Sequence, residues 1–218
     1  MPGLLLALAL VPVGHVNDFA QILRPETVSR LETALTEFER TTGNEIAVVT
    51  ISTRGPDETI ESYAVTLFEK WGIGKEKEDN GILLLIARDD REVRIEVGYG
   101  LEPEVTDIES VAIIRENIVP AFRAGDYDKG VEDAVTKIIE SIKSSAQPES
   151  ASPFPWEDVI WLVIFLIIIF INIRRKRQGK SSVFPVFFGR RGGFNDKGGG
   201  FGGFGGGMSG GGGSSGRW

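Results

Sequence analysis

Carboxylates are the side chains with which this chain could do chemistry. Among its 218 residues there is one His, at position 15, and there is no Cys. These counts exclude a disulfide framework, thiolate nucleophiles, zinc ribbons and iron–sulfur ligation, and they argue against a Ser-His-Asp triad or a His general base. Any reaction would therefore depend on carboxylates, hydroxyls, backbone groups or a hard cation held by oxygen ligands.

Acidic residues recur where the expected strands of residues 15–145 begin and end. Because a helix returns the chain to the end of the sheet where the preceding strand began, Asp79-Asn80-Gly81 should lie beside the Gly98-Tyr99-Gly100 turn. Carboxylates next to glycine-rich backbone suit Ca²⁺, which takes about six to eight oxygen ligands, or a cation that holds a substrate phosphate. One end of the sheet then collects Asp79, Asn80, Tyr99, Glu102, Glu104 and Asp107, and the opposite end collects Asp89, Asp90, Arg91 and Asp126.

The same residues also have structural explanations. Asp79-Asn80-Gly81 is an ordinary turn tripeptide. Asp107 in the first turn of a helix is favoured by the helix dipole, and Glu102 and Glu104 can simply face solvent. The first cluster is therefore a candidate metal or phosphate site, and a purely structural role is the alternative.

Hydrophobic periodicity predicts the elements that position these side chains. Apolar residues spaced three and four apart predict helices, apolar runs predict buried strands, and the alternation from Glu92 to Val97 predicts a half-exposed strand. Thr106 and Glu109 form a capping box, and Asp126 is expected to cap the last helix. The expected helices cover 25–41, 56–71, 106–122 and the residues after 126, and the expected strands cover 45–52, 81–88 and 91–97.

The order of these elements, α-β-α-β-β-α-α, predicts the fold class. The first two strands are joined by a helix, so they should pair in parallel through a right-handed crossover, and the third strand should return by a hairpin. We therefore expect a three-layer α-β-α sandwich with a mixed sheet and helices on both of its faces.

Two apolar segments predict a membrane protein. Residues 159–173, VIWLVIFLIIIFINI, carry no charge and are followed at once by RRKRQGK at 174–180. This pattern predicts one transmembrane helix over 156–173 with its basic side in the cytoplasm. Residues 1–14 resemble the apolar part of a secretory signal peptide without its basic start. The lipid bilayer is thus an expected partner, and the folded domain is expected outside the cytoplasm.

Composition separates the folded domain from the tail. Residues 15–147 carry 15 basic and 27 acidic side chains, in a chain of net charge −7, and this acidic balance argues against nucleic-acid binding. Of the 28 glycines, 17 lie within 179–218, which predicts a disordered cytoplasmic tail. The predicted parts are the leader 1–14, the α/β domain 15–145, a Pro/Ser linker 146–155, the transmembrane helix 156–173, and the basic and Gly/Phe-rich tail 174–218.

Five stretches of sequence together resemble the TPM domain family. Among its members, the bacterial membrane proteins of the YgcG type have the most similar layout, with an anchor and a glycine-rich tail. The resemblance covers about residues 15–143. The stretches are VNDFAQIL at 16–23, EDNGILLLIARDDREVRIEVGYGLE at 78–102, VTDIE at 105–109, IVPAFRAGDYDKGV at 118–131 and the terminal GGGSSGRW.

The resemblance implies an α/β sandwich that faces a non-cytoplasmic space. Plant thylakoid-lumen relatives are associated with photosystem II repair, acid phosphatase activity and Ca²⁺ binding. The acidic motif of the family falls on Asp79, Asp107 and Asp126, with Asn80 adjacent. Together with Glu102 these residues are the candidate metal ligands, Ca²⁺ is the expected ion, and no catalytic residue is assigned.

Three functions from different classes follow. The first is a membrane-tethered extracytoplasmic binding or accessory module for an envelope or membrane protein complex, which the missing catalytic base and the anchored layout favour. The second is a metal-dependent phosphatase that uses Asp79 and Asp107. The third places the function in the tail, as a cytoplasmic association element.

Overall fold

The computed structural model of the protein describes residues 10–146, 164–165 and 205–218. The chain divides into two compact units, residues 1–146 with 198–218 and residues 147–197. Nearly all of the predicted linker and transmembrane helix, and residues 1–9 of the predicted leader, lie outside the described residues. Within the described part of the chain, no helix is both long and apolar enough to cross a membrane.

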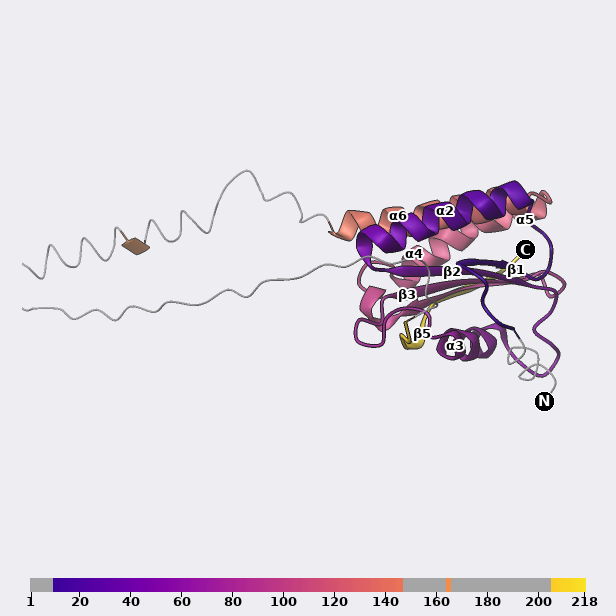
Figure 1. Cartoon of the computed structure of the whole chain (residues 1–218). Coiled ribbons are helices and arrows are strands. Elements are labelled where there is room, and N and C mark those ends of the chain that lie inside the picture. Colours follow the sequence, from indigo (N-terminus) through magenta and orange to yellow (C-terminus); the bar gives the residue numbers. More distant parts are fainter. Residues whose placement is uncertain (1–9, 147–163, 166–204) are drawn as a thin grey trace, which may run out of the picture. The chain divides into compact units, whose positions relative to one another are not determined.

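A mixed sheet of five strands forms the centre of the first unit (Figure 1), in the order β1-β2-β3-β4-β5. The first three strands pair in parallel, whereas β3–β4 and β4–β5 are antiparallel. The predicted parallel crossover and hairpin are therefore confirmed. The strands are β1 (Val16–Asp18), β2 (Glu45–Ile51), β3 (Gly81–Ala87), β4 (Glu92–Gly98) and β5 (Ser209–Arg217).

Helices cover both faces of this sheet, as the sequence predicts. Four of the helices lie on one face, with α2 and α6 side by side, and α3 lies on the other face (Figure 1). Pro25 occupies the first turn of α2, where it replaces an unpaired N–H, and Gly43 ends the helix in a left-handed conformation. The helices are α2 (Pro25–Thr42), α3 (Ile60–Trp71), α4 (Asp107–Ile113), α5 (Val119–Arg123) and α6 (Tyr127–Ala146).

Alternate residues of the strands divide the core into two layers. Ile82 and Leu84 pack with the stripe of α2 that contains Leu35, whereas Leu83 and Leu85 pack against α3. Phe68 of α3 is fully buried. Burial of such a side chain stabilises the folded state by about 1.5–3 kcal/mol, so the two faces together hold the sheet in place.

The region predicted as one helix over 106–122 is divided into three segments. The capping box of Thr106 and Glu109 is present and starts α4. A π-helical turn, Ile114–Ile118, then separates α4 from α5, and the amide of Val119 donates to the carbonyl of Ile114. Pro120 follows directly and has no N–H with which to continue an α-helical ladder.

The polar face of β4 is buried, although its alternating sequence predicts a half-exposed strand. Glu92, Arg94 and Glu96 are 4%, 5% and 0% exposed. They are covered because β5 pairs with β4 along its outer edge and α3 contacts both strands. The polar residues of this alternating sequence form buried ion pairs and do not face water: Arg94 pairs with Glu96, and Glu92 pairs with Arg54 and Arg217.

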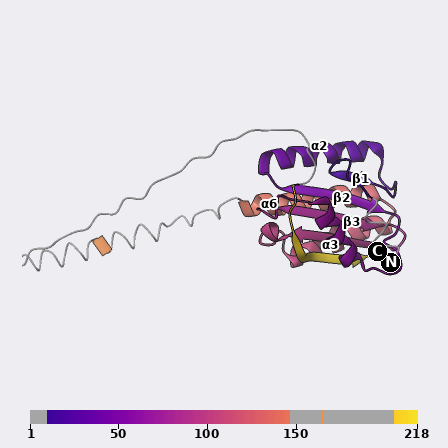
Figure 2. The same ribbon diagram turned by 60° about the horizontal axis from the view of Figure 1, so that its bottom comes forward.

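The prediction of a disordered tail is wrong for the end of the chain. Residues 209–217 form β5, the edge strand beyond β4, which is drawn in yellow in Figure 2. Pairing with β4 along most of the length of β5 offsets the entropy cost of ordering this glycine-rich segment. Intramolecular pairing also requires that β5 and the domain lie on the same side of any membrane, which a single crossing between a domain outside and a tail inside does not allow.

Candidate functional site

The edge of the sheet beside β4 forms a groove that holds the end of the chain. The groove lies between α3 and α4, both of which contact β5. The β4–β5 ladder runs from Glu92 opposite Arg217 to Gly98 opposite Ser209, with an irregularity at Val97/Gly98. We call this surface the tail groove and its occupant, residues 205–218, the tail strand. Main-chain pairing of this kind supplies affinity with little dependence on the side chains of the bound segment.

Close walls make glycine necessary in the tail strand. Gly213 has φ +101°, and a Cβ there would clash with the carbonyl oxygen of Ile95. A Cβ on Gly210 would clash with the phenol of Tyr99, and one on Gly212 would lie 2.6 Å from the Glu102 carboxylate. Glycine at position 213 is therefore a steric requirement of the groove, whereas Gly210 and Gly212 allow the side chains of Tyr99 and Glu102 to lie close to the strand.

Two of the predicted metal ligands bind backbone amides of the tail strand. Asp79 Oδ1 accepts from the amide of Met208 at 2.7 Å, and Asp107 Oδ1 accepts from the amide of Gly213 at 2.7 Å. Together with Glu102 against Gly212, these carboxylates follow the path of the tail strand across one end of the sheet. The sequence predicts these three residues at one end of the sheet, and in the structure they line a peptide segment.

A buried ion pair on β4 also forms hydrogen bonds with the tail strand. The guanidinium of Arg94 binds the carboxylate of Glu96 at 2.7 Å and donates to the carbonyls of Gly211 and Gly212 at 2.8 and 3.0 Å. Glu96 in turn accepts from the hydroxyl of Ser209 at 2.5 Å. Because buried charges are costly when they lack partners, the tail strand completes a network that β4 alone leaves open.

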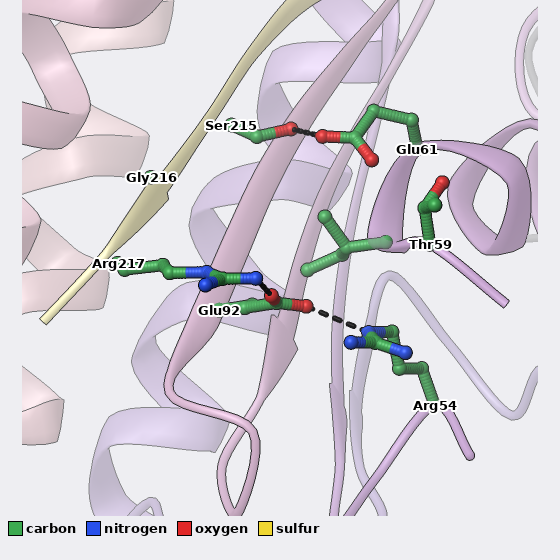
Figure 3. A pocket seen from close by; sticks show the side chains of 8 residues that line it. Arg54, Thr59, Glu61, Glu92, Ser215, Gly216 and Arg217 are labelled. Atoms are coloured by element: carbon green, nitrogen blue, oxygen red, sulfur yellow. Dashed lines mark hydrogen bonds and ion pairs between the residues drawn. The ribbon is translucent and has the colours of Figure 1, made fainter. Parts of the chain in front are cut away.

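A pocket of 290 Å³ lies at the far end of the tail strand (Figure 3). Glu92 lies there between Arg54, at 2.7 Å, and Arg217 of the tail strand. The hydrogen bond to Glu92 raises the pKa of the Arg54 guanidinium. Ser215 points toward Glu61 of α3 and donates to it at 2.6 Å, and this bond lowers the pKa of the Glu61 carboxyl.

An aromatic contact fixes the last residue. The ring of Trp218 meets Phe122 edge-on, with centroids 4.7 Å apart, and lies 6.3 Å from the ring of Tyr127. Its backbone amide donates to the carbonyl of Arg91. Aromatic pairs of this geometry contribute about 0.5–1.5 kcal/mol beyond area burial, so Trp218 anchors the strand at the end opposite Asp79.

The opposite anchor is at the start of the tail strand. Glu45 is 4% exposed and accepts from the amides of Gly74 at 2.8 Å and Gly205 at 3.4 Å. Burial raises the pKa of this carboxyl. Gly206 donates to the carbonyl of Gly72 at 2.5 Å, so the strand is held before it reaches β4.

The five candidate metal ligands do not converge on one point. The Asn80 side chain accepts from the amide of Lys75 and donates to the carbonyl of Gly43, so it shapes its own turn. Asp126 accepts from the amide of Lys129 and caps α6, as predicted. Across the described ranges, no group of three or more His, Cys, Asp or Glu side chains is arranged to hold a metal ion. As they lie here, the five candidate side chains do not form one ligand set, and Ca²⁺ binding stays a prediction.

The remaining predicted residues have separate roles. Tyr99 is half-exposed and its ring covers Gly210. Asp89 pairs with Arg88, whereas Asp90 accepts from the amide of Arg54 at 2.8 Å. Sequence reasoning missed Glu61, Arg94 and Glu96 as parts of the site. For Arg94 and Glu96, the sequence does contain a signal. Charged residues on a strand that pairs with the entirely apolar β3 are expected to need buried polar partners.

The fold and groove define an α/β sandwich domain whose sheet is completed by a glycine-rich strand from the end of the chain. The TPM domain profile matches residues 16–141, and the chain belongs to the TPM domain family. No curated protein sequence matches it.

Solved structures of bacterial proteins are similar to part of this chain. The N-terminal domain of a protein from P. gingivalis is 34% identical to this chain, with a TM-score of 0.56; the match covers 60% of this chain and 83% of that one. The BA42 protein of Bizionia argentinensis is 22% identical with a TM-score of 0.48, over 56% of this chain and 82% of that one.

Replacement of the two amide-binding carboxylates should loosen the tail strand. We expect Asp79→Asn and Asp107→Asn each to weaken docking by about 1 kcal/mol, because a neutral amide is a poorer acceptor than a carboxylate. Hydrogen–deuterium exchange of residues 205–218 measures the effect as faster exchange. Asp57→Asn, which removes an exposed carboxylate elsewhere, is the control and should leave this exchange unchanged. Equal exchange in all variants would contradict the role of the two carboxylates.

Removal of the Ser215 hydroxyl should change the titration of Glu61. In Ser215→Ala we expect the pKa of Glu61 to rise toward its ordinary value, because the hydrogen bond that lowers it is lost. A lowered carboxyl pKa contributes stability above the unfolded-state pKa, and this contribution is lost as the pH falls through the folded-state pKa. Carboxyl-carbon NMR titration measures the change, and Ser144→Ala on α6 is the control. An unchanged Glu61 titration would show that Ser215 does not reach it in solution.

Proposed function

We propose that this protein is a membrane-tethered binding module whose site is the tail groove and whose ligand is an extended, glycine-rich peptide strand. The observation that supports this most directly is the steric and polar fit between the groove and residues 205–218. Main-chain pairing, two amide-binding carboxylates and the Arg94 guanidinium all engage peptide groups. This is recognition by addition of a strand to a sheet edge.

The same contacts weigh against a phosphatase. Asp79 and Asp107 would be its candidate residues, and both accept hydrogen bonds from the tail strand. Because the tail strand engages both carboxylates in this way, the binding role accounts directly for these contacts at the acidic end of the sheet.

The proposal keeps an attachment of residues 156–173 to the membrane and the likeness to anchored members of the YgcG type, but it gives up the single crossing that the sequence predicts, because one crossing would separate residues 15–145 from the tail strand. It places residues 15–145 and the tail strand together on the non-cytoplasmic side, which replaces the cytoplasmic tail expected from sequence. In this position the module would serve as an accessory to an envelope or membrane protein complex.

A free tail peptide should bind when the resident strand is displaced. In full-length Gly213→Val we expect the tail strand to leave the groove, because the new side chain meets the backbone of Ile95. A synthetic peptide of residues 205–218 should then bind saturably, as measured by calorimetry or fluorescence anisotropy. The same peptide should bind wild type at least about tenfold more weakly, a difference of 1.4 kcal/mol, because the resident strand competes.

Met208→Val is the matched control for this experiment. It adds the same side chain to the tail strand at a position that is 56% exposed, so the resident strand should stay and exclude the peptide. A peptide that itself carries Gly213→Val should bind neither protein. Failure of the unmodified peptide to bind folded Gly213→Val protein would refute the proposed function.

The absence of native Cys allows a direct test of sidedness. We expect Ser144→Cys and Met208→Cys both to react with a membrane-impermeant maleimide added outside intact cells, because both positions are exposed and the proposal places them on the non-cytoplasmic side. Protein lacking any introduced Cys controls for background. Labelling of Ser144→Cys alone, with Met208→Cys reacting only after lysis, would instead support a cytoplasmic tail.

A further inference from the structure

We propose that the tail groove also accepts the tail strand of a second copy of this chain, so that two copies associate by exchanging β5. The inference rests on the proposed function and names the partner of the same site. The question is whether the strand in the groove belongs to the same chain or to a second copy.

Contacts of the tail strand do not depend on its connection to the same chain. Its partners lie between Glu45 and Tyr127, and 58 residues, 147–204, separate it from the end of α6. A segment of that number of residues has a contour of at most about 3.3–3.6 Å per residue, which permits delivery to a neighbouring groove. A second copy would therefore make the same hydrogen bonds, ion pair and ring contacts.

Selectivity of the groove restricts the occupant to a segment like this one. Glycine is needed at Gly207 and Gly213, where a Cβ would meet the backbone carbonyl oxygens of Ile73 and Ile95. Arg217 pairs with Glu92, and Trp218 packs on Phe122, so basic and aromatic residues are favoured at the end. A second copy carries all of these features at the required spacing.

An empty groove gives the exchange its driving force. Without β5, the seven-residue β4 becomes an open edge, and unpaired edge strands are prone to pair with other chains. The Arg94 guanidinium would also lose its two carbonyl acceptors. Each copy contributes one groove and one strand, so reciprocal exchange closes as a two-fold dimer and does not propagate.

The test pairs a copy whose tail cannot dock with a copy whose tail is intact. Full-length Gly213→Val protein, affinity-tagged and detergent-solubilised, is mixed with fluorescently labelled wild-type chain. We expect capture of the wild-type chain, and at least about tenfold less capture of a labelled Gly213→Val chain, a difference of 1.4 kcal/mol. Tagged Met208→Val, which keeps its own strand, should also capture less because its groove is occupied.

Gly207→Val provides a second tail variant in case Gly213→Val does not fold. Its new side chain would meet the backbone carbonyl oxygen of Ile73, so it should displace the strand by a different contact. Equal capture of wild-type and Gly213→Val labelled chains would overturn the proposal, because the association would not use the tail strand. If the tagged copy binds the synthetic 205–218 peptide but never captures the wild-type chain, exchange is refuted and the peptide-binding function stands. If it binds neither, both proposals fail.

Discussion

The close approach of a nearly bare backbone to β4 is the constraint on which the rest of this structure depends. On one side of the tail strand, the Ile95 carbonyl occupies the space that a Cβ of Gly213 would need, and on the other the Tyr99 ring covers Gly210. A side chain at Gly213 could not be accommodated unless the backbone of β4 moved, and a Cβ on Gly207 would likewise meet the carbonyl oxygen of Ile73. The walls of the groove therefore require glycine at these two positions of the tail strand.

Electrostatic interactions add to the steric fit between the tail strand and the groove. Arg94 and Glu96 are buried side by side on β4, and a buried ion pair is stable only when its remaining donors and acceptors are also satisfied. The carbonyls of Gly211 and Gly212 and the hydroxyl of Ser209 supply those partners. The tail strand is therefore part of the polar interior of the domain. Its loss would expose the charged groups of Arg94 and Glu96 as well as the edge of β4.

Local sequence patterns predict those elements whose stabilising contacts join residues that are close in sequence. The capping box at Thr106, the cap at Asp126 and the hairpin between β3 and β4 are of this kind, and the structure contains all three. Topology alone also predicts that Asp79, Glu102 and Asp107 lie at one end of the sheet. What those carboxylates contact could not be predicted, because their partners Met208 and Gly213 lie more than 100 residues away in a segment whose composition is typical of disorder.

The two edges of the sheet explain why only one of them receives a strand. The β1 edge is three residues long, and its Asp18 accepts from the amides of Ile22 and Leu23, which turns the chain away from the sheet. Short edges of this kind resist pairing with other chains. The β4 edge is seven residues long and carries charges that need partners, so it favours the addition of a strand. Pairing with other chains is therefore prevented at the β1 edge by the shortness of that strand, and at the β4 edge by β5. Displacement of β5 would expose the β4 edge and allow it to bind another strand.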